Sequence, residues 1–121
     1  MNEILLVDDD ATIRFGCAHV LEREGYRVTQ AETGRVALQL LRRKKFDILI
    51  TDVIMPEMDG LELIRSVRAV DPDIRIIAMS GGSFRLDLDF LSFASAFGAN
   101  ASLMKPFASH QLLDLLPVRA G

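Results

Sequence analysis

Three consecutive carboxylates, those of Asp8, Asp9 and Asp10, follow the apolar run 4-ILLV-7. Adjacent negative charges repel one another by roughly 1 to 4 kcal/mol per close pair, depending on the dielectric. A divalent cation would offset this repulsion, because Mg²⁺ prefers oxygen ligands and needs only one or two direct carboxylates. The triplet alone leaves two interpretations open, a metal site or a solvated strand end. Asp10 is better explained as the N-cap of the next helix.

Asp52, Ser80 and Lys105 each follow a further apolar run. A lysine pairs readily with a carboxylate or a phosphate, and the glycines at 81 and 82 let a ligand approach the backbone closely. A carboxylate beside a hydroxyl, an amine and a metal suits phosphoryl transfer, which depends on positioning and on neutralising the charge of the moving group. Asp52 is then the expected nucleophile. Taken singly, Lys105 also fits a surface turn and Ser80 an ordinary loop.

The elements that must position these side chains alternate along the chain. Five short runs rich in Ile, Val and Leu predict strands at 3–7, 26–30, 47–51, 74–79 and 101–104. Helical periodicity lies between them, and one of these helices has an apolar stripe that includes Phe93, Ala94 and Phe97. A last helix starts at 108 or 109 and stops before Pro117.

Five βα units in succession predict an α/β fold, a parallel sheet with helices on both faces. In open sheets of this kind the functional crevice lies beyond the carboxyl ends of the strands. The acids, the hydroxyl and the amine described above all follow strand ends. We therefore expect them to converge on one edge of the sheet.

The bulk composition favours a cytoplasmic protein of one domain. The 121 residues carry a net charge of -3, whereas proteins that bind nucleic acids are usually basic. Cys17 is the single cysteine, which rules out an internal disulfide and suits a reducing cytosol. No signal peptide is visible, and no apolar run approaches the roughly 20 residues of a membrane helix. We expect residues 1–121 to form the domain, with 117–121 as a terminal tail or the start of a linker.

The ordered fragments resemble bacterial response-regulator receiver domains over nearly the whole chain. They are 5-LLVDDD-10, 47-DILITDVIMPEMDG-60, 76-IIAMSG-81 and 103-LMKPF-107. The resemblance implies a single-domain receiver with a flavodoxin-like, doubly wound, five-stranded parallel sheet of strand order 2-1-3-4-5. It also implies a phosphoacceptor in a two-component phosphorelay, which catalyses only its own phosphorylation and dephosphorylation and is otherwise no enzyme.

The resemblance further assigns a role to each site residue. Asp52 accepts a phosphoryl group from the phosphohistidine of a histidine kinase, Ser80 hydrogen-bonds that group, and Lys105 forms an ion pair with it. A cis peptide bond precedes Pro106. The implied ligands of Mg²⁺ are Asp8, Asp9, Asp52 and the backbone carbonyl of Ile54.

The implied partners are a histidine kinase or phosphotransfer protein and a downstream protein. The latter would bind the face made by the fourth helix, the fifth strand and the fifth helix, without direct contact to nucleic acid, and the chain would be a monomer or weak dimer. The sequence departs from the family at Ser102, where receivers commonly carry an aromatic residue that changes rotamer. We expect the loop containing Phe84 to carry the conformational readout instead, with a merely longer loop as the alternative.

Two further interpretations stay open. The fragment from Asp8 to Thr12 also fits the D-x-D-x-T signature of haloacid-dehalogenase-like phosphatases, in which Asp8 would be the nucleophile and Asp10 the general acid. The chain is short for that family, and Asp52 would be left without a role. The other alternative is a receiver-like scaffold whose output switch is altered.

Overall fold

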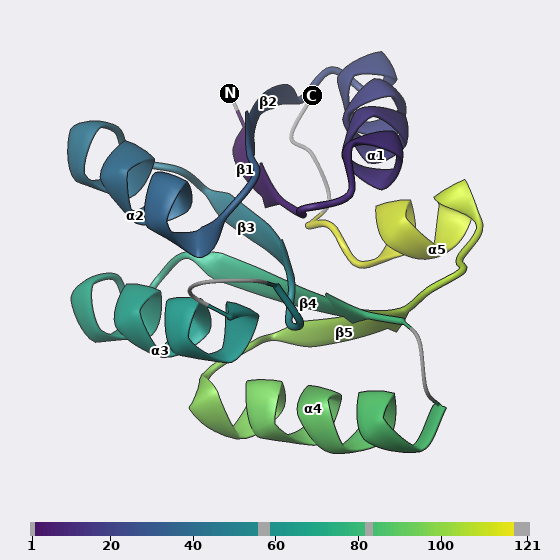
Figure 1. Ribbon diagram of the computed structural model, residues 1–121. Helices are drawn as coiled ribbons and strands as arrows, with labels where there is room; N and C mark the ends of the chain where they lie inside the picture. The colour runs from purple at the N-terminus through teal and green to yellow at the C-terminus, as the bar shows by residue number, and fades with distance from the viewer. Residues whose placement is uncertain (1, 56–58, 82–83, 118–121) are drawn as a thin grey trace.

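Strands and helices alternate along the chain in the computed structural model (Figure 1). It describes residues 2–55, 59–81 and 84–117, and for residues 84–90 the backbone only. The strands are β1 (Glu3–Val7), β2 (Arg27–Ala31), β3 (Ile48–Asp52), β4 (Arg75–Ser80) and β5 (Ala101–Met104). The helices are α1 (Ala11–Arg23), α2 (Gly34–Arg43), α3 (Gly60–Val70), α4 (Phe84–Phe97) and α5 (Ser109–Asp114).

The five strands form one sheet of order β2-β1-β3-β4-β5, and every neighbouring pair is parallel. This confirms the predicted fold class and strand order. The middle strand β3 is buried along its whole length. Its near-continuous apolar sequence is typical of a parallel strand covered on both faces, because no face of it is left to carry polar side chains.

Three strands lie one residue later than their apolar runs predict, and this places Asp52 and Ser80 inside the sheet. Asp52 pairs with Met79 of β4, and Ser80 pairs with Met104 of β5. Backbone pairing continues past the last apolar side chain, because the ladder depends on backbone groups and not on side-chain polarity. Both polar residues therefore stand on backbone that the sheet holds in place.

Helices cover both faces of the sheet (Figure 1), and each face has its own apolar core. Leu5 and Leu49 point toward the face covered by α2, α3 and α4, whereas Leu6 and Ile50 point toward the face covered by α1 and α5. Successive strand residues alternate between faces, so each strand supplies both cores. Cys17 of α1 lies buried in the second core.

The predicted apolar stripe of α4 is only partly correct. Ala94 is fully buried, but Phe93 and Phe97 are 54% and 37% exposed. Leu91 packs against the core beside Ala94 instead. The Phe97 ring lies 5.9 Å from the guanidinium of Arg65 on α3, so it contacts a charged neighbour at the rim between the two helices.

Two arginines connect loops at the amino-terminal edge of the sheet. Arg68 of α3 donates hydrogen bonds to the carbonyl oxygens of Ile74 at 2.7 Å and Gly98 at 2.8 Å. Arg75, the first residue of β4, donates from Nε to the carbonyl oxygen of Leu115 at 2.9 Å. These bonds tie the segments around α3, α4 and α5 together at the edge opposite the strand ends that carry the acids.

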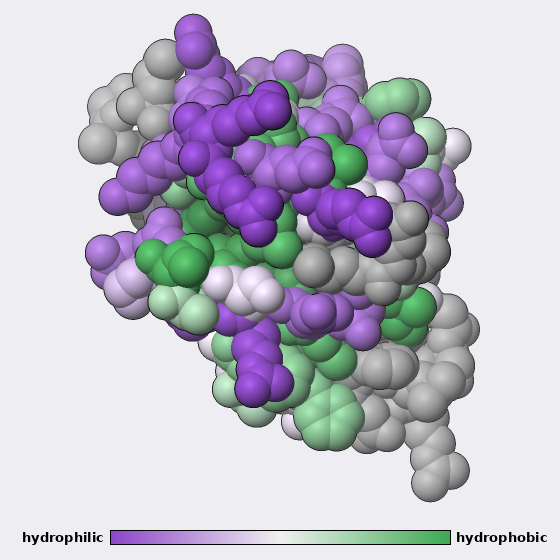
Figure 2. Space-filling model, turned by 60° about the vertical axis from the view of Figure 1, so that its left-hand side comes forward, coloured by the Kyte–Doolittle hydropathy of each residue, from purple (hydrophilic) through white to green (hydrophobic). Residues whose placement is uncertain are grey.

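The face that α2 and α3 present is largely hydrophilic, with separate apolar groups between the polar side chains (Figure 2). Val36 of α2 and Val70 of α3 are among the exposed apolar residues. In the described part of the chain, no helix has both the length and the apolar character needed to cross a membrane.

Candidate functional site

Three acidic residues meet at the carboxyl edge of the sheet. Asp8 and Asp9 directly follow β1, and Asp52 ends the neighbouring strand β3. One carboxylate oxygen of each lies within 4.8 Å of the other two. Asp8 and Asp52 are buried, whereas Asp9 is exposed. The expected convergence of the acids at the strand ends is therefore present.

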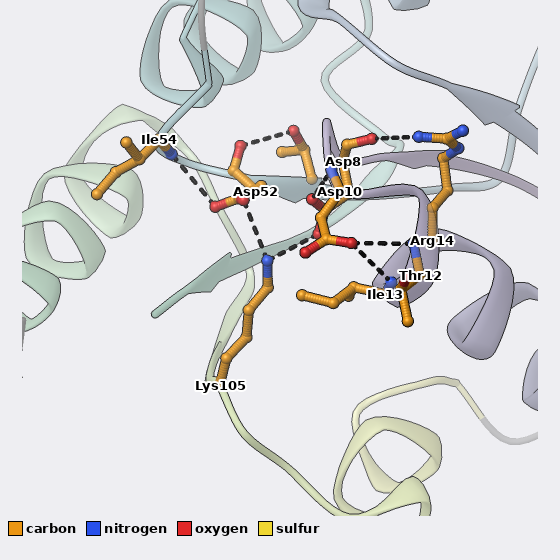
Figure 3. Close-up of polar contacts among 9 residues, drawn as sticks. Asp8, Asp10, Thr12, Ile13, Arg14, Asp52, Ile54 and Lys105 are labelled. Atoms are coloured by element: carbon orange, nitrogen blue, oxygen red, sulfur yellow. Dashed lines mark hydrogen bonds and ion pairs between the residues drawn. The ribbon is translucent and has the colours of Figure 1, made fainter. Parts of the chain in front are cut away.

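Lys105 joins two of these carboxylates. Its Nζ lies 2.7 Å from Asp8 Oδ2 and 3.1 Å from Asp52 Oδ2 (Figure 3). The peptide bond between Lys105 and Pro106 is cis, as the family resemblance implies. The ammonium thus supplies part of the counter-charge that the acidic run needs. The sequence pattern indicates the lysine as a partner for charge but does not reveal that it bridges Asp8 and Asp52.

Burial and ion pairing act in opposite directions on this group. Burial raises the pKa of the Asp52 carboxyl above its usual range; the nearby Lys105 opposes this effect, and the charge of Asp8 adds to it. Burial alone would lower the pKa of Lys105, but the hydrogen bonds and charges of Asp8 and Asp52 outweigh it and raise that pKa. Lys105 is therefore protonated at neutral pH, and its ammonium only partly offsets the effect of burial on the pKa of Asp52.

Asp10 acts as a helix cap. Its Oδ1 accepts hydrogen bonds from the backbone N–H groups of Thr12 at 2.9 Å and Ile13 at 3.3 Å, which confirms the predicted N-cap of α1 (Figure 3). Its own N–H donates to Asp8 Oδ1 at 2.9 Å. The Asp10 carboxylate is thus used in starting α1, while the Asp10 backbone N–H supports the orientation of Asp8.

Ile54 and Gly60 both lie against Asp52. The Ile54 N–H donates to Asp52 Oδ1 at 3.3 Å, and the Ile54 side chain is 45% exposed. Gly60 begins α3 so close to β3 that a Cβ there would lie 2.0 Å from the carbonyl oxygen of Asp52. Only glycine fits this approach without a backbone shift.

Ser80 and Gly81 border the site on the side of β4. Ser80 is fully buried, and its carbonyl oxygen accepts a hydrogen bond from the Lys105 N–H at 2.7 Å. A Cβ on Gly81 would lie 2.7 Å from Cβ of Lys105, so the glycine leaves room for the lysine stem. Residue 82 and the side chain of Phe84 lie outside the described residues. Ser102, which stands where an aromatic was expected, is exposed on β5.

A groove of about 820 Å³ extends from the acids between α1 and α5. Asp9 and Lys105 lie among its polar residues, and its apolar lining includes Ile13, Val20 and Leu112. Gly16, in the middle of α1, also lines it, and a Cβ at that position would meet nothing within 4 Å. The groove is large enough for a ligand or for side chains of a partner.

Arg14 is a residue of the site that the sequence pattern does not single out. It lies in the first turns of α1, is only 8% exposed, and donates from Nη1 to the carbonyl oxygen of Asp8 at 2.8 Å. Its partners are the Asp8 carbonyl and the Gln30 side chain on β2, and no pattern of residue types shows that α1 brings Arg14 to either of them. The only available signal is a charged residue next to the apolar stripe of α1.

Comparison with known proteins places this arrangement in a family of signalling domains. The family model described as "Response regulator receiver domain" matches residues 4–117. The chain therefore belongs to the response-regulator receiver family. This family generally does not consist of classical enzymes.

Individual relatives cover most of the chain. It is 34% identical over 115 residues to Sporulation initiation phosphotransferase F of Bacillus subtilis, covering 94% of this chain and 90% of that protein. It is 42% identical over 81 residues to Response regulator receiver protein CpdR of Brucella abortus, covering 67% and 68%. Among solved structures, a CheY-like receiver domain from Methanospirillum hungatei superposes with a TM-score of 0.87 at 32% identity, covering 94% and 89%.

The phosphatase interpretation does not fit this arrangement. It needs Asp10 as a general acid, but the Asp10 carboxylate caps α1. It also leaves Asp52 without a role, although Asp52 lies beside Asp8 and shares Lys105 with it. The chain is a receiver domain of the two-component response-regulator type, with an acidic pocket that could hold a metal ion.

Proposed function

We propose that this domain receives a phosphoryl group on Asp52 from the phosphohistidine of a histidine kinase or phosphotransfer protein. The observation that carries the proposal is the Lys105 ammonium, which lies within 3.1 Å of a buried Asp52 carboxylate among two further acids. A buried carboxylate with incomplete charge compensation is a nucleophile, and a fixed cation beside it can stabilise charge on the incoming group.

The transfer is a displacement at phosphorus. An Asp52 carboxylate oxygen forms a bond to phosphorus as the bond from phosphorus to the histidine nitrogen breaks, and the electron pair of that bond stays on the imidazole. The product is an acyl phosphate on Asp52. In this proposal Lys105 forms an ion pair with the phosphoryl oxygens, and the Ser80 hydroxyl donates a hydrogen bond to them.

Mg²⁺ fits the donor set, because hard oxygen ligands from two neighbouring strand ends are the kind this ion prefers. The proposed ligands are the carboxylates of Asp8, Asp9 and Asp52 and the backbone carbonyl of Ile54. When bound, the ion neutralises negative charge on the acceptor and on the transferred group. The groove between α1 and α5 opens onto these residues and offers the donor protein a place to approach.

The signal would then pass to a partner protein through local rearrangement. A phosphoryl group adds up to about two negative charges and strong acceptors, which would draw Ser80 and Lys105 toward it. Because Lys105 lies on the segment after β5, the movement would reach the face made by α4, β5 and α5. We propose that this face binds the downstream protein. We also propose that residues 1–121 act as one cytoplasmic domain. In this proposal the domain is a monomer or weak dimer and does not contact nucleic acid directly.

Phosphorylation by acetyl phosphate and Mg²⁺, followed by intact-protein mass spectrometry, tests the acceptor. We expect wild type to gain one phosphoryl group, Asp52→Asn to gain none, and Asp8→Asn to gain it slowly. Asp114→Asn, which changes an exposed acid on α5, should behave as wild type. Labelling that persists in Asp52→Asn and disappears in Asp8→Asn would contradict the proposal and make Asp8 the nucleophile.

A further inference from the structure

The backbone of Asp8 is held on both sides at the point where β1 ends. Its N–H donates to the carbonyl oxygen of Ala31 at 3.2 Å, and its carbonyl oxygen accepts from Arg14 Nη1 at 2.8 Å. The pairing of β1 with both β2 and β3 ends at Val7, so the ladder provides no partner for this carbonyl. A buried carbonyl of this kind needs a hydrogen bond from elsewhere, and Arg14 supplies it.

Arg14 connects three elements through its guanidinium. It belongs to α1, it bonds the strand end of β1 through Nη1, and its Nε donates to Gln30 Oε1 on β2 at 3.0 Å. Figure 3 shows that Arg14 and Lys105 approach Asp8 from opposite sides. Lys105 holds the carboxylate and Arg14 holds the backbone, so Asp8 is fixed at both ends.

The peptide group that Arg14 holds links Asp8 to Asp9 and therefore helps to place Asp9. Asp9 is exposed, and no hydrogen bond to another described side chain or to the described backbone holds its carboxylate. That carboxylate nevertheless lies within 4.8 Å of those of Asp8 and Asp52. Its position depends on the backbone before it, because no side-chain contact fixes it.

We infer that Arg14 is a positioning residue, which fixes the Asp8–Asp9 peptide and thereby strengthens the binding of a divalent cation by the acidic site. The inference rests on the proposed function. Arg14 acts through the Asp8 backbone and does not contact the proposed acceptor Asp52. Removing a group that hydrogen-bonds a metal ligand and orients it commonly lowers metal affinity by about 10- to 100-fold.

Calorimetric titration with Mg²⁺ tests this inference on wild type, Arg14→Met, Arg14→Lys and Arg75→Met. Arg14→Met keeps the length of the side chain and removes its donors, so we expect its dissociation constant for Mg²⁺ to rise about tenfold or more. Arg14→Lys keeps the charge and one donor group and should lose less. Arg75→Met is the matched control, because Arg75 also bonds a backbone carbonyl but at the opposite edge of the sheet. It should lower the melting temperature and leave Mg²⁺ affinity unchanged.

The rate of phosphorylation by acetyl phosphate gives a second measurement. In Arg14→Met the Mg²⁺ concentration for half-maximal rate should rise by the same factor as the dissociation constant, while the rate at saturating Mg²⁺ stays that of wild type. A purely structural role would lower the melting temperature without moving either Mg²⁺ value, and that result would overturn the inference.

The outcomes also separate this inference from the proposed function. If wild type binds Mg²⁺ and Arg14→Met binds it with the same affinity, only the inference about Arg14 is overturned. Wild type that fails to bind Mg²⁺ overturns both. If Arg14→Met does not fold, Arg14→Lys decides: weaker Mg²⁺ binding supports the inference, and unchanged binding by the folded variant overturns it.

Discussion

The environment of Asp52 disfavours a charge on its carboxyl group, and this has a consequence for stability. Its pKa is raised chiefly by burial, so the folded protein holds a proton on Asp52 more readily than the unfolded chain does. A group with a raised folded-state pKa stabilises the fold below its unfolded pKa, and this contribution is lost as pH rises through the folded value. Ionised Asp52 therefore costs stability at neutral pH when no metal is bound.

Asp52→Asn should accordingly raise the melting temperature of the metal-free protein at pH 7 to 8 by a few degrees. The gain should shrink as the pH falls toward the usual pKa of an aspartate, where the wild-type carboxyl takes up its proton. Thermal unfolding followed by circular dichroism in the presence of a chelator checks this. Asp114→Asn serves as the control, and an equal gain at every pH would contradict the electrostatic explanation.

Two glycines show how much local surroundings matter at the scale of a helix. Gly16 lies inside α1, where an added methyl group would have nothing within 4 Å, whereas Gly60 begins α3 against the Asp52 carbonyl oxygen. Alanine is favoured over glycine within a helix by about 0.5–1 kcal/mol. At Gly60, the added methyl group would force the backbone of α3 or β3 to move, at a cost of about 1–3 kcal/mol.

Gly16→Ala should therefore stabilise the protein and Gly60→Ala should destabilise it, although the chemical change is the same. Urea unfolding of both variants measures the two free energies. Gly60→Ala should also slow phosphorylation, because the displaced backbone carries Asp52. Similar stability changes in the two variants would show that contacts around Gly60 do not limit the position of α3.

The elements differ in how far their sequence determines them. The strands follow from apolar runs because buried parallel strands leave little choice of residue type, but their ends depend on pairing, which carries Asp52 and Ser80 into the sheet. Phe97 lies partly exposed beside Arg65, a residue far away in the sequence, and helical periodicity does not show this neighbour. The role of Arg14 could not be predicted because its bonds to the Asp8 carbonyl and to Gln30 depend on how α1 packs against the sheet. Sequence patterns reveal side-chain types, and these three features depend on tertiary contacts.

For the molecule as a whole, cation binding and folding are linked. A ligand that binds only the folded state stabilises it by about 2.7 kcal/mol at a hundred times its dissociation constant. We expect the melting temperature to rise with Mg²⁺ concentration in wild type, because the three acids come together only after folding. Asp9→Asn should lose most of this rise while unfolding at nearly the wild-type temperature in chelator, since Asp9 is exposed. A full response to Mg²⁺ in this variant would contradict its role as a ligand.

Arg68 and Arg75 bond backbone carbonyls at the edge of the sheet remote from the acids. A substitution at these arginines and a substitution among the acids should therefore affect the protein in different ways. The first would shorten the lifetime of the folded protein and reduce its abundance in the cell. The second would leave a stable protein at normal abundance, but this protein would not transmit the signal.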